Sequence, residues 1–360
     1  MNIVLVSTYA VECGIATYTE ALAQALKSQG HSVTVLAEIR DKQPMSQTID
    51  GVPVYRIWAR SMHNSAMYGL SSIIRAIDSS PTKPDVVHFQ HEFGLFPDSY
   101  GLTQLMEQLI ARGIRVVTTL HTVLAPPEGT GFFPLLIGEV IVHTDEAAAA
   151  LLTHWVPDHV RVVPHGLTPG VVVPARRTNG RGSSILVPGF VGRNKGTLEI
   201  LEGFAEHVVR TQDWLSTLRI LGLCRDERFE LELRQNVARY CLDRRVILDL
   251  GFQTVPTVHE AFAWADFVIL GAGETTPYSA SGQLSGCISH GVPVLAKNVP
   301  IYRSGGDCGI VLYEEDELAP LIGALSNLGL RERLQQKHAI VAATRTWDII
   351  AQKHMEIYSG

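Results

Sequence analysis

Short apolar runs rich in β-branched residues alternate along the chain with segments whose apolar residues recur at helical spacing. The first run, Ile3 to Ser7, predicts a strand, and the segment Ile15 to Ser28 predicts a helix because its apolar residues recur three or four positions apart. Gly30 ends this helix, and Ser32 to Ala37 predicts a second strand. A strand, a helix and a strand in this order indicate a βαβ unit.

The same alternation continues through the first half of the chain. Strands that are buried on both faces and separated by helices are typical of a parallel, doubly wound sheet. The further strands are expected at Val52 to Ile57, Val86 to Phe89, Val116 to Thr119, Val140 to Val142 and Val160 to Val163, and the helices at Ser99 to Ala111 and Asp145 to His154.

A stretch rich in Pro, Gly, Arg and Ser, Leu167 to Ser184, interrupts the pattern and is interpreted as a connection between domains. The alternation then restarts, and 360 residues are too many for one ordinary core. We therefore expect an α/β protein of two doubly wound domains, residues 1–168 and 169–344, with a ligand cleft between them. The second domain is expected to hold strands at Ile185 to Pro188, Leu218 to Leu221, Val246 to Leu250, Phe267 to Leu270 and Val292 to Ala296, and helices at Thr197 to Val208, Glu227 to Tyr240, Val258 to Trp264 and from Ser281.

The composition is that of a compact globular protein, with 46% hydrophobic and 18% charged residues. A formal charge of −6 gives no electrostatic reason to expect a nucleic-acid partner. Five cysteines without a CxxC pair favour a reducing cytoplasm. Neither a signal peptide nor an apolar run of about 18 residues is apparent, so no membrane span is expected.

Candidate chemistry is expected at the carboxyl ends of the strands, where open parallel sheets bind ligands. Cys13 and Gly14 follow the first strand, and a glycine there lets a diphosphate or sugar approach free N–H groups, unless it only permits a tight turn. His91 with Glu92, and His121, follow two further strands. They are expected to project into the cleft and contact an acceptor or a sugar, the alternative being structurally satisfied histidines.

A glycine-rich turn, GFVGRNKG, lies between the first strand of the second domain and its helix. Gly192, Arg193, Lys195 and Gly196 would present backbone N–H groups and two cations to one phosphate without a metal. Thr197 could cap the following helix. The alternative is that this turn is a solvated surface loop without a ligand.

A second helix start with small residues follows the strand Phe267 to Leu270. It would bind the donor diphosphate together with the glycine-rich turn, while Glu274 in the preceding loop would accept hydrogen bonds from sugar hydroxyls. The residues expected in this part of the donor site are Ser279, Ser281, Gly282, Gln283 and Leu284.

Several nucleotide and metal motifs are missing from the sequence. The glycines after the first strand do not spell GxGxxG, no GxxxxGK[ST] occurs, and no Asp-x-Asp pair occurs. These absences disfavour a dinucleotide site, a P-loop and a metal chelated by paired aspartates. Neither a cofactor nor a metal is expected. Cations and helix dipoles would then have to neutralise the charge of a departing diphosphate.

Seven motifs occur in the order typical of one family: CGIATYTEALAQALKSQGHSVTVL, HFQHEFGLF, TLHT, VVPHGL, GFVGRNKG, LGFQTVPTVHEAFAWADFVIL and GVPVLAKNVP. The chain resembles the GT-B glycosyltransferases of family 4 over essentially its whole length. The resemblance implies two Rossmann-like domains and a terminal helix, within residues 345–360, that crosses back onto the N-terminal domain. It also implies retaining transfer of a hexose from a nucleotide-diphosphate sugar.

The resemblance also implies roles for single residues. Gly14 matches the second of the family's two N-terminal glycines, and His121 matches a histidine near the transferred sugar. Lys195 matches the cation that stabilises the leaving phosphate, whereas Arg193 lies closer to it than the usual spacing.

One departure from the family concerns its paired glutamates, whose positions hold Tyr278 and Gly286 in this chain. Glu274 is expected to take over part of the sugar contact. An inactive, degenerate member is therefore an alternative.

The expected donor is GDP-mannose, with UDP-glucose next, and the expected acceptor is a saccharide or glycolipid bound by the N-terminal domain. The leaving phosphate would help to deprotonate the acceptor, as the resemblance implies. No basic amphipathic patch supports contact with a membrane surface. The alternatives are a sugar- or nucleotide-binding protein without transfer, and an epimerase that acts on the donor.

Overall fold

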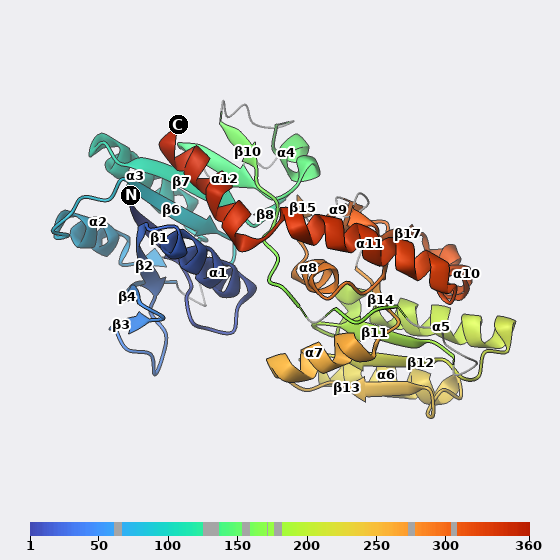
Figure 1. Cartoon of the computed structure of the whole chain (residues 1–360). Coiled ribbons are helices and arrows are strands. Elements are labelled where there is room, and N and C mark those ends of the chain that lie inside the picture. Colours follow the sequence, from blue (N-terminus) through green and yellow to red (C-terminus); the bar gives the residue numbers. More distant parts are fainter. Residues whose placement is uncertain are drawn as a thin grey trace. The chain divides into compact units, whose positions relative to one another are not determined.

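The computed structural model describes the chain except for residues 61–66, 125–136, 153–158, 171, 176–181, 273–277 and 304–307, and forms two compact units (Figure 1). Unit 1 comprises Met1–Gly166, Pro277–Ala280 and Trp347–Gly360, and unit 2 comprises Leu167–Thr276 and Ser281–Thr346. The chain therefore returns to unit 1 at its C-terminal end. Each unit is built on a parallel sheet with helices on both faces, so the predicted doubly wound α/β class is confirmed.

Unit 1 contains a nine-stranded sheet of order β10-β9-β7-β6-β1-β2-β4-β3, with β5 paired to β4. The strands are parallel except for β3 and β5, which pair antiparallel with β4. The strands are β1 (Asn2–Ser7), β2 (Ser32–Glu38), β3 (Ser46–Ile49), β4 (Val52–Arg60), β5 (Met67–Tyr68), β6 (Val86–His91), β7 (Arg115–Leu120), β9 (Glu139–Val142) and β10 (Val160–Val162). A separate antiparallel pair joins β8 (Thr122–Val123) to β15 (Tyr278–Ser279).

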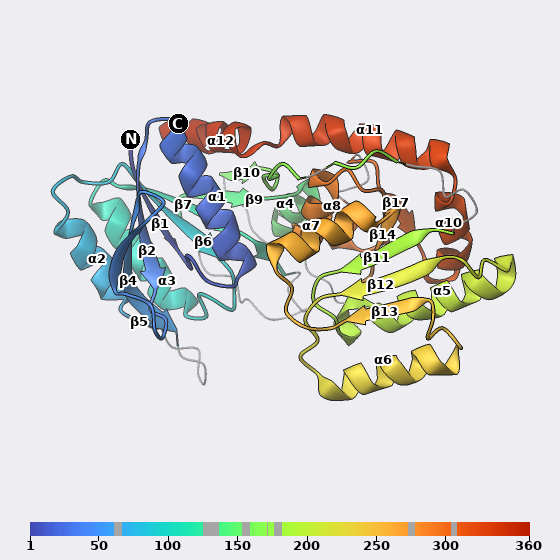
Figure 2. The same ribbon diagram turned by 60° about the horizontal axis from the view of Figure 1, so that its bottom comes forward.

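The helices of unit 1 cover both faces of its sheet. They are α1 (Gly14–Ser28), α2 (Leu70–Asp78), α3 (Ser99–Ala111), α4 (Asp145–Leu152) and α12 (Trp347–Ser359). Ile3 and Leu5 of β1 share a core with α1 and α12, whereas Val6 belongs to the core that contains α2 and α3. Helix α12 packs against α1, and both figures of the whole chain show the two helices as neighbours (Figures 1 and 2).

Unit 2 contains a six-stranded, wholly parallel sheet of order β13-β12-β11-β14-β16-β17. In Figure 2, α6 and α7 lie on opposite sides of this sheet. The strands are β11 (Ser184–Pro188), β12 (Thr217–Leu221), β13 (Val246–Asp249), β14 (Phe267–Leu270), β16 (Val294–Lys297) and β17 (Val311–Tyr313). The helices are η1 (Arg193–Lys195), α5 (Thr197–Thr211), α6 (Glu227–Arg239), α7 (Val255–Trp264), α8 (Gly282–Ser289), α9 (Pro300–Arg303), η3 (Glu315–Glu317), α10 (Leu318–Leu325) and α11 (Leu328–Thr344).

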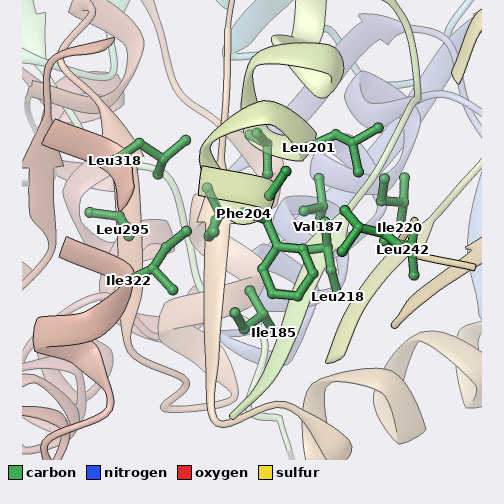
Figure 3. Packing of buried hydrophobic residues seen from close by; sticks show 14 of the residues in the cluster. Ile185, Val187, Leu201, Phe204, Leu218, Ile220, Leu242, Leu295, Leu318 and Ile322 are labelled. Atoms are coloured by element: carbon green, nitrogen blue, oxygen red, sulfur yellow. The ribbon is translucent and has the colours of Figure 1, made fainter. Parts of the chain in front are cut away.

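Alternation along the strands divides the core of unit 2 into two layers. Ile185 and Val187 of β11 pack with Phe204 of α5 and with α10, as Figure 3 shows. Leu186, which points to the other face, packs with residues of α7 and α8 such as Phe262. Period-two alternation on a sheet covered by helices on both sides produces this division.

The predicted elements were found with small shifts at their ends. Helix α7 begins at Val255, three residues before its expected start, because the side chain of Thr254 caps it and accepts from the N–H of Thr257 at 3.4 Å. The helix α2 and the strands β3, β5, β8, β15 and β17 were not predicted. Tyr278 and Ser279 belong to unit 1, although the sequence places them in the second domain.

Within the described parts of the chain, no helix is long and apolar enough to cross a membrane.

Candidate functional site

Two loops meet at the carboxyl edge of the unit 2 sheet, because β11 and β14 are neighbours in it. A Cβ on Gly271, just after β14, would lie 2.5 Å from the carbonyl oxygen of Lys195, which follows β11. A small cavity at this point is lined by both loops and by Gln283 of α8. The structure therefore brings together the glycine-rich turn and the second helix start that the sequence singles out.

The glycine-rich turn is a single 3-10 turn that leads directly into α5. The N–H of Lys195 donates to the carbonyl of Gly192 at 3.0 Å, and Gly196 has a positive φ of 63°. Thr197 does not cap the helix as predicted, because its hydroxyl donates to the carbonyl of Gly192 at 3.3 Å. Gly196 takes the N-cap position and has no side chain to offer.

Side-chain capping differs among the helices that follow strands of the two large sheets. Helices α1 and α5 have Cys13 and Gly196 at the N-cap and no side-chain cap bond. Their first N–H groups remain available to a bound anion. The N-termini of α3, α4, α6 and α7 are bonded by Asp98, Thr144, Asp226 and Thr254.

The N-terminus of α8 is held beside the end of β11. The amide Nε2 of Gln283 donates to the carbonyl of Pro188 at 2.7 Å, and Ser281 Oγ accepts from the N–H of Leu284 at 3.2 Å. Gly282 is exposed, and a Cβ there would meet no atom within 4 Å. The predicted donor residues from Ser281 to Leu284 thus form one helix start with open space in front of Gly282.

The two cations of the turn have different surroundings. The guanidinium of Arg193 pairs with the carboxylate of Glu232 on α6 and lies 5.3 Å from the ring centre of Phe229. Lys195 lines the cavity and forms no ion pair within the described part of the chain. In this structure Arg193 is paired with a carboxylate on the next helix, and its expected role beside Lys195 stays a prediction.

Lys297, at the carboxyl end of β16, is a cation that the sequence reasoning missed. Its ammonium lies 2.7 Å from the carboxylate of Glu199 in the first turn of α5. Both side chains are largely buried. The signal was a lysine directly after the apolar run of a central strand.

Cys13 and Gly14 lie at the start of α1 in unit 1. Cys13 occupies the N-cap, and its Sγ accepts from the hydroxyl of Thr8 at 3.7 Å. Gly14 is exposed, has no positive φ, and a Cβ on it would meet no atom within 4 Å. The surrounding protein therefore does not require a glycine here, which leaves room for a ligand.

His91 and Glu92 are held inside unit 1. The His91 ring is fully buried and stacks on Phe96, and neither ring nitrogen has a hydrogen-bond partner among the described residues. Burial lowers the pKa of His91 to about 4. Glu92 accepts from the hydroxyl of Thr122 at 2.6 Å and from the N–H of Phe93 at 3.1 Å, while burial raises its pKa. The expectation that His91 projects from the core is wrong, because the rings of Phe93 and Phe96 pack against it.

His121 is part of a buried network of rings. Its Nε2 lies 2.9 Å from Oε1 of Gln90, and its Nδ1 lies 3.2 Å from Nε2 of His143. The ring of Tyr18 meets it edge-on at 4.8 Å. Burial, with the neighbouring His143, holds the pKa of His121 well below its ordinary value.

The network assigns the protons on these rings. His143 must donate from Nδ1 to the carbonyl of Val163, at 2.9 Å, because a carbonyl only accepts. Burial lowers the pKa of His143 to about 3, so the ring is neutral and its Nε2 accepts from Nδ1 of His121. The amide nitrogen of Gln90 lies 3.2 Å from Nε2 of His88, so Gln90 connects this ring to His121.

The network reaches the C-terminal helix through His88. Nδ1 of His88 lies 2.6 Å from the hydroxyl of Tyr358, and its Nε2 lies 2.8 Å from the hydroxyl of Thr119. His354 on the same helix lies 3.4 Å from the hydroxyl of Tyr18. Helix α12 is therefore joined by hydrogen bonds to the strands that hold His121.

Ser279, one of the predicted donor residues, belongs to unit 1. Ser279 pairs with Thr122 in the small antiparallel sheet of unit 1, and Glu274 lies outside the described residues. Among the described residues, no group of three or more His, Cys, Asp or Glu side chains could hold a metal ion.

Residues 13–170 match the family model described as Glycosyltransferase Family 4. No curated protein matches the sequence. A glycosyltransferase from Rickettsia africae has a TM-score of 0.74 and 14% identity, covering 99% of this chain and 97% of its own. HepE from Anabaena, in complex with UDP-glucose, has a TM-score of 0.72 and 14% identity, covering 100% of this chain and 99% of its own.

The catalytic domain of starch synthase IV from Arabidopsis thaliana, bound to ADP and acarbose, is also similar. Its TM-score is 0.68 at 13% identity, and the match covers 100% of this chain and 99% of that one. Identities this low show the fold of the whole chain, whereas the family model matches the sequence of the N-terminal part.

Proposed function

We propose that this chain, a family 4 glycosyltransferase with the GT-B fold, transfers a hexosyl group from a nucleoside-diphosphate sugar to an acceptor hydroxyl. The observation that carries the proposal is the uncapped N-terminus of α5 beside Lys195, at a cavity that α8 also borders. Free N–H groups, and an ammonium that has no ion pair among the described residues, suit a diphosphate. A neutral ligand would leave that ammonium without a counter-charge.

The chemical step asks for stabilisation of the charge that develops on the leaving diphosphate. Preorganised donors of this kind contribute about 3 to 4 kcal/mol each to the transition state. Lys195 and the first N–H groups of α5 would supply this stabilisation from unit 2, together with the N–H groups of Gly282 and Gln283. We therefore propose that transfer needs neither a metal nor an organic cofactor.

We propose retention of the anomeric configuration, in which the leaving phosphate accepts the proton of the acceptor hydroxyl. The support is the match to family 4 and the resemblance of the motifs to that family. His121 would face the transferred sugar. Because both of its nitrogens are bonded within unit 1, it would act as a fixed neutral ring and not as a proton carrier.

For the donor we propose GDP-mannose or UDP-glucose. HepE was solved with UDP-glucose and with UDP, which favours the second of these, whereas the resemblance favours the first. Unit 1, which carries Gly14 and the residues around it, would bind a saccharide or glycolipid acceptor.

All five cysteines are unpaired, which supports a reducing, cytoplasmic setting.

The test is a screen of UDP-, GDP- and ADP-sugars for stabilisation against heat, followed by release of the nucleoside diphosphate with candidate acceptors. A donor present at 100 times its dissociation constant should stabilise the fold by about 2.7 kcal/mol. Proton NMR of the product reports the anomeric configuration. Isomerised donor without an acceptor would identify an epimerase, and binding without release would identify a binding protein.

A further inference from the structure

Three arginines of unit 1 converge on Glu38 at the carboxyl ends of β2 and β4. Glu38, the last residue of β2, is only 3% exposed. Its Oε2 lies 2.6 Å from the guanidinium of Arg40, and its Oε1 lies 2.9 Å from Nε of Arg60. The guanidinium of Arg56 donates to the backbone carbonyl of Glu38 at 3.1 Å.

The cluster carries more positive charge than its carboxylate balances. Arg56 is fully buried, and its second guanidinium nitrogen donates to the backbone carbonyl of Tyr9 at 2.9 Å. Burial lowers the pKa of Arg56, the positive charge of Arg40 lowers it further, and only Glu38 raises it. The single carboxylate of Glu38 therefore lies among three positively charged guanidinium groups.

Hydrogen-bond donors also remain unused in the cluster. Nε of Arg40 and Nε of Arg56 are buried and have no acceptor among the described residues. The side chains of Arg40 and Arg60 are 36% and 20% exposed, so solvent and ligands reach them. An arrangement that served only to hold the fold would not need a second guanidinium at the carboxylate of Glu38 and a third at its backbone carbonyl.

The position of the cluster suits a ligand. The carboxyl ends of parallel strands form the binding edge of a doubly wound sheet. Arg56 bonds to the loop between β1 and α1, and Arg60 donates to the carbonyl of Gly94 in the loop after β6. The loop after β1 also carries Gly14, so the cluster and this open helix start share one edge of one unit.

We propose that Arg40 and Arg60 bind an anionic phosphate group of the acceptor at this edge of unit 1. Arginine suits this ligand because its planar fork matches phosphate oxygens in paired hydrogen bonds. The assignment of this phosphate to the acceptor rests on the proposed transferase activity, whereas the anion site itself rests on the geometry of unit 1 alone. The acceptor would then be a phosphorylated sugar or a lipid phosphate.

The test measures binding of inorganic phosphate by calorimetry at constant ionic strength, in a Lys195→Ala chain that lacks the donor cation. Arg60→Ala and Arg40→Ala should each raise the dissociation constant of phosphate about tenfold or more, because each removes a charge-assisted hydrogen bond. Arg60→Lys should recover part of the loss. Arg75→Ala, which removes an exposed arginine from α2, is the matched control and should bind as the parent does. Equal phosphate affinity in the parent and both cluster variants would overturn the proposal.

Two further arms identify the source of the phosphate. Glycerol 3-phosphate represents a soluble phosphate ester, and phosphatidylcholine vesicles with and without phosphatidic acid represent a lipid headgroup. Binding in either arm that Arg60→Ala abolishes supports the site and names the source, whereas binding in neither arm overturns it. Since no arm uses a donor, absence of transferase activity would leave these results unchanged.

Discussion

The substitution Gly282→Ala separates the role of the α8 N-terminus in donor binding from its role in the fold. Gly282 is the first residue of α8, lacks a positive φ, and a Cβ on it would meet no atom within 4 Å. The methyl group therefore causes no strain, and an alanine at a helical position adds up to about 1 kcal/mol to the free energy of unfolding relative to glycine.

The same methyl group would occupy the space through which a diphosphate approaches the first N–H groups of α8. Loss of one charge-assisted hydrogen bond costs about 1.5 to 3 kcal/mol, which corresponds to a rise of about 10- to 100-fold in the KM of the donor. The assay is donor-saturation kinetics of nucleoside-diphosphate release, with thermal unfolding measured on the same preparation.

Gly189→Ala is the contrasting control. Gly189 has a φ of 100°, and a Cβ on it would lie 1.8 Å from Nε2 of Gln283, so this variant should unfold at a lower temperature. A donor KM for Gly282→Ala equal to that of the wild type, in a protein at least as stable as the wild type, would refute the placement of the donor at α8.

Two further predictions concern the buried rings of unit 1. Tyr358→Phe leaves Nδ1 of His88 without its hydrogen-bond partner at 2.6 Å and should lower the free energy of unfolding by about 1 to 3 kcal/mol in urea titrations. Tyr55→Phe at an exposed position should not lower it, and equal losses in both variants would contradict the network. Burial lowers the pKa of His91 and of His354 to about 4, below the value of about 6.5 in the unfolded chain, so the stability they give is complete above pH 6.5 and lost as the pH falls toward 4. The contribution of each histidine to the free energy of unfolding should fall by about 2 kcal/mol between pH 7 and pH 5. A urea midpoint that does not change over that range would refute the direction of these pKa shifts.

The strands, most helices and the glycine-rich turn could be predicted because their signals are local. A buried parallel strand is a continuous apolar run, and a helix shows its period within three turns. Lys195 and Gly196 stand between such a strand and such a helix, so their place at the carboxyl edge followed from the order of elements.

The partners of the site residues could not be predicted, because they depend on contacts between distant parts of the chain. Arg193 is bound by Glu232 on the next helix, and β15 pairs with β8, which lies far earlier in the sequence. The ring network around His121 joins three strands to the C-terminal helix, whereas the sequence showed only single histidines at the exits of strands and none of their partners.

The central claim is that Lys195 and the α5 N-terminus bind the diphosphate of a nucleotide sugar. The most direct measurement is the affinity of UDP and GDP for the wild type and for Lys195→Ala by titration calorimetry, with Lys337→Ala on the exposed surface of α11 as control. We predict that the wild type and the control bind one of the two nucleotides equally well, and that Lys195→Ala binds it at least about tenfold more weakly. Equal affinity in all three proteins, or no binding of either nucleotide by the wild type, would contradict the claim.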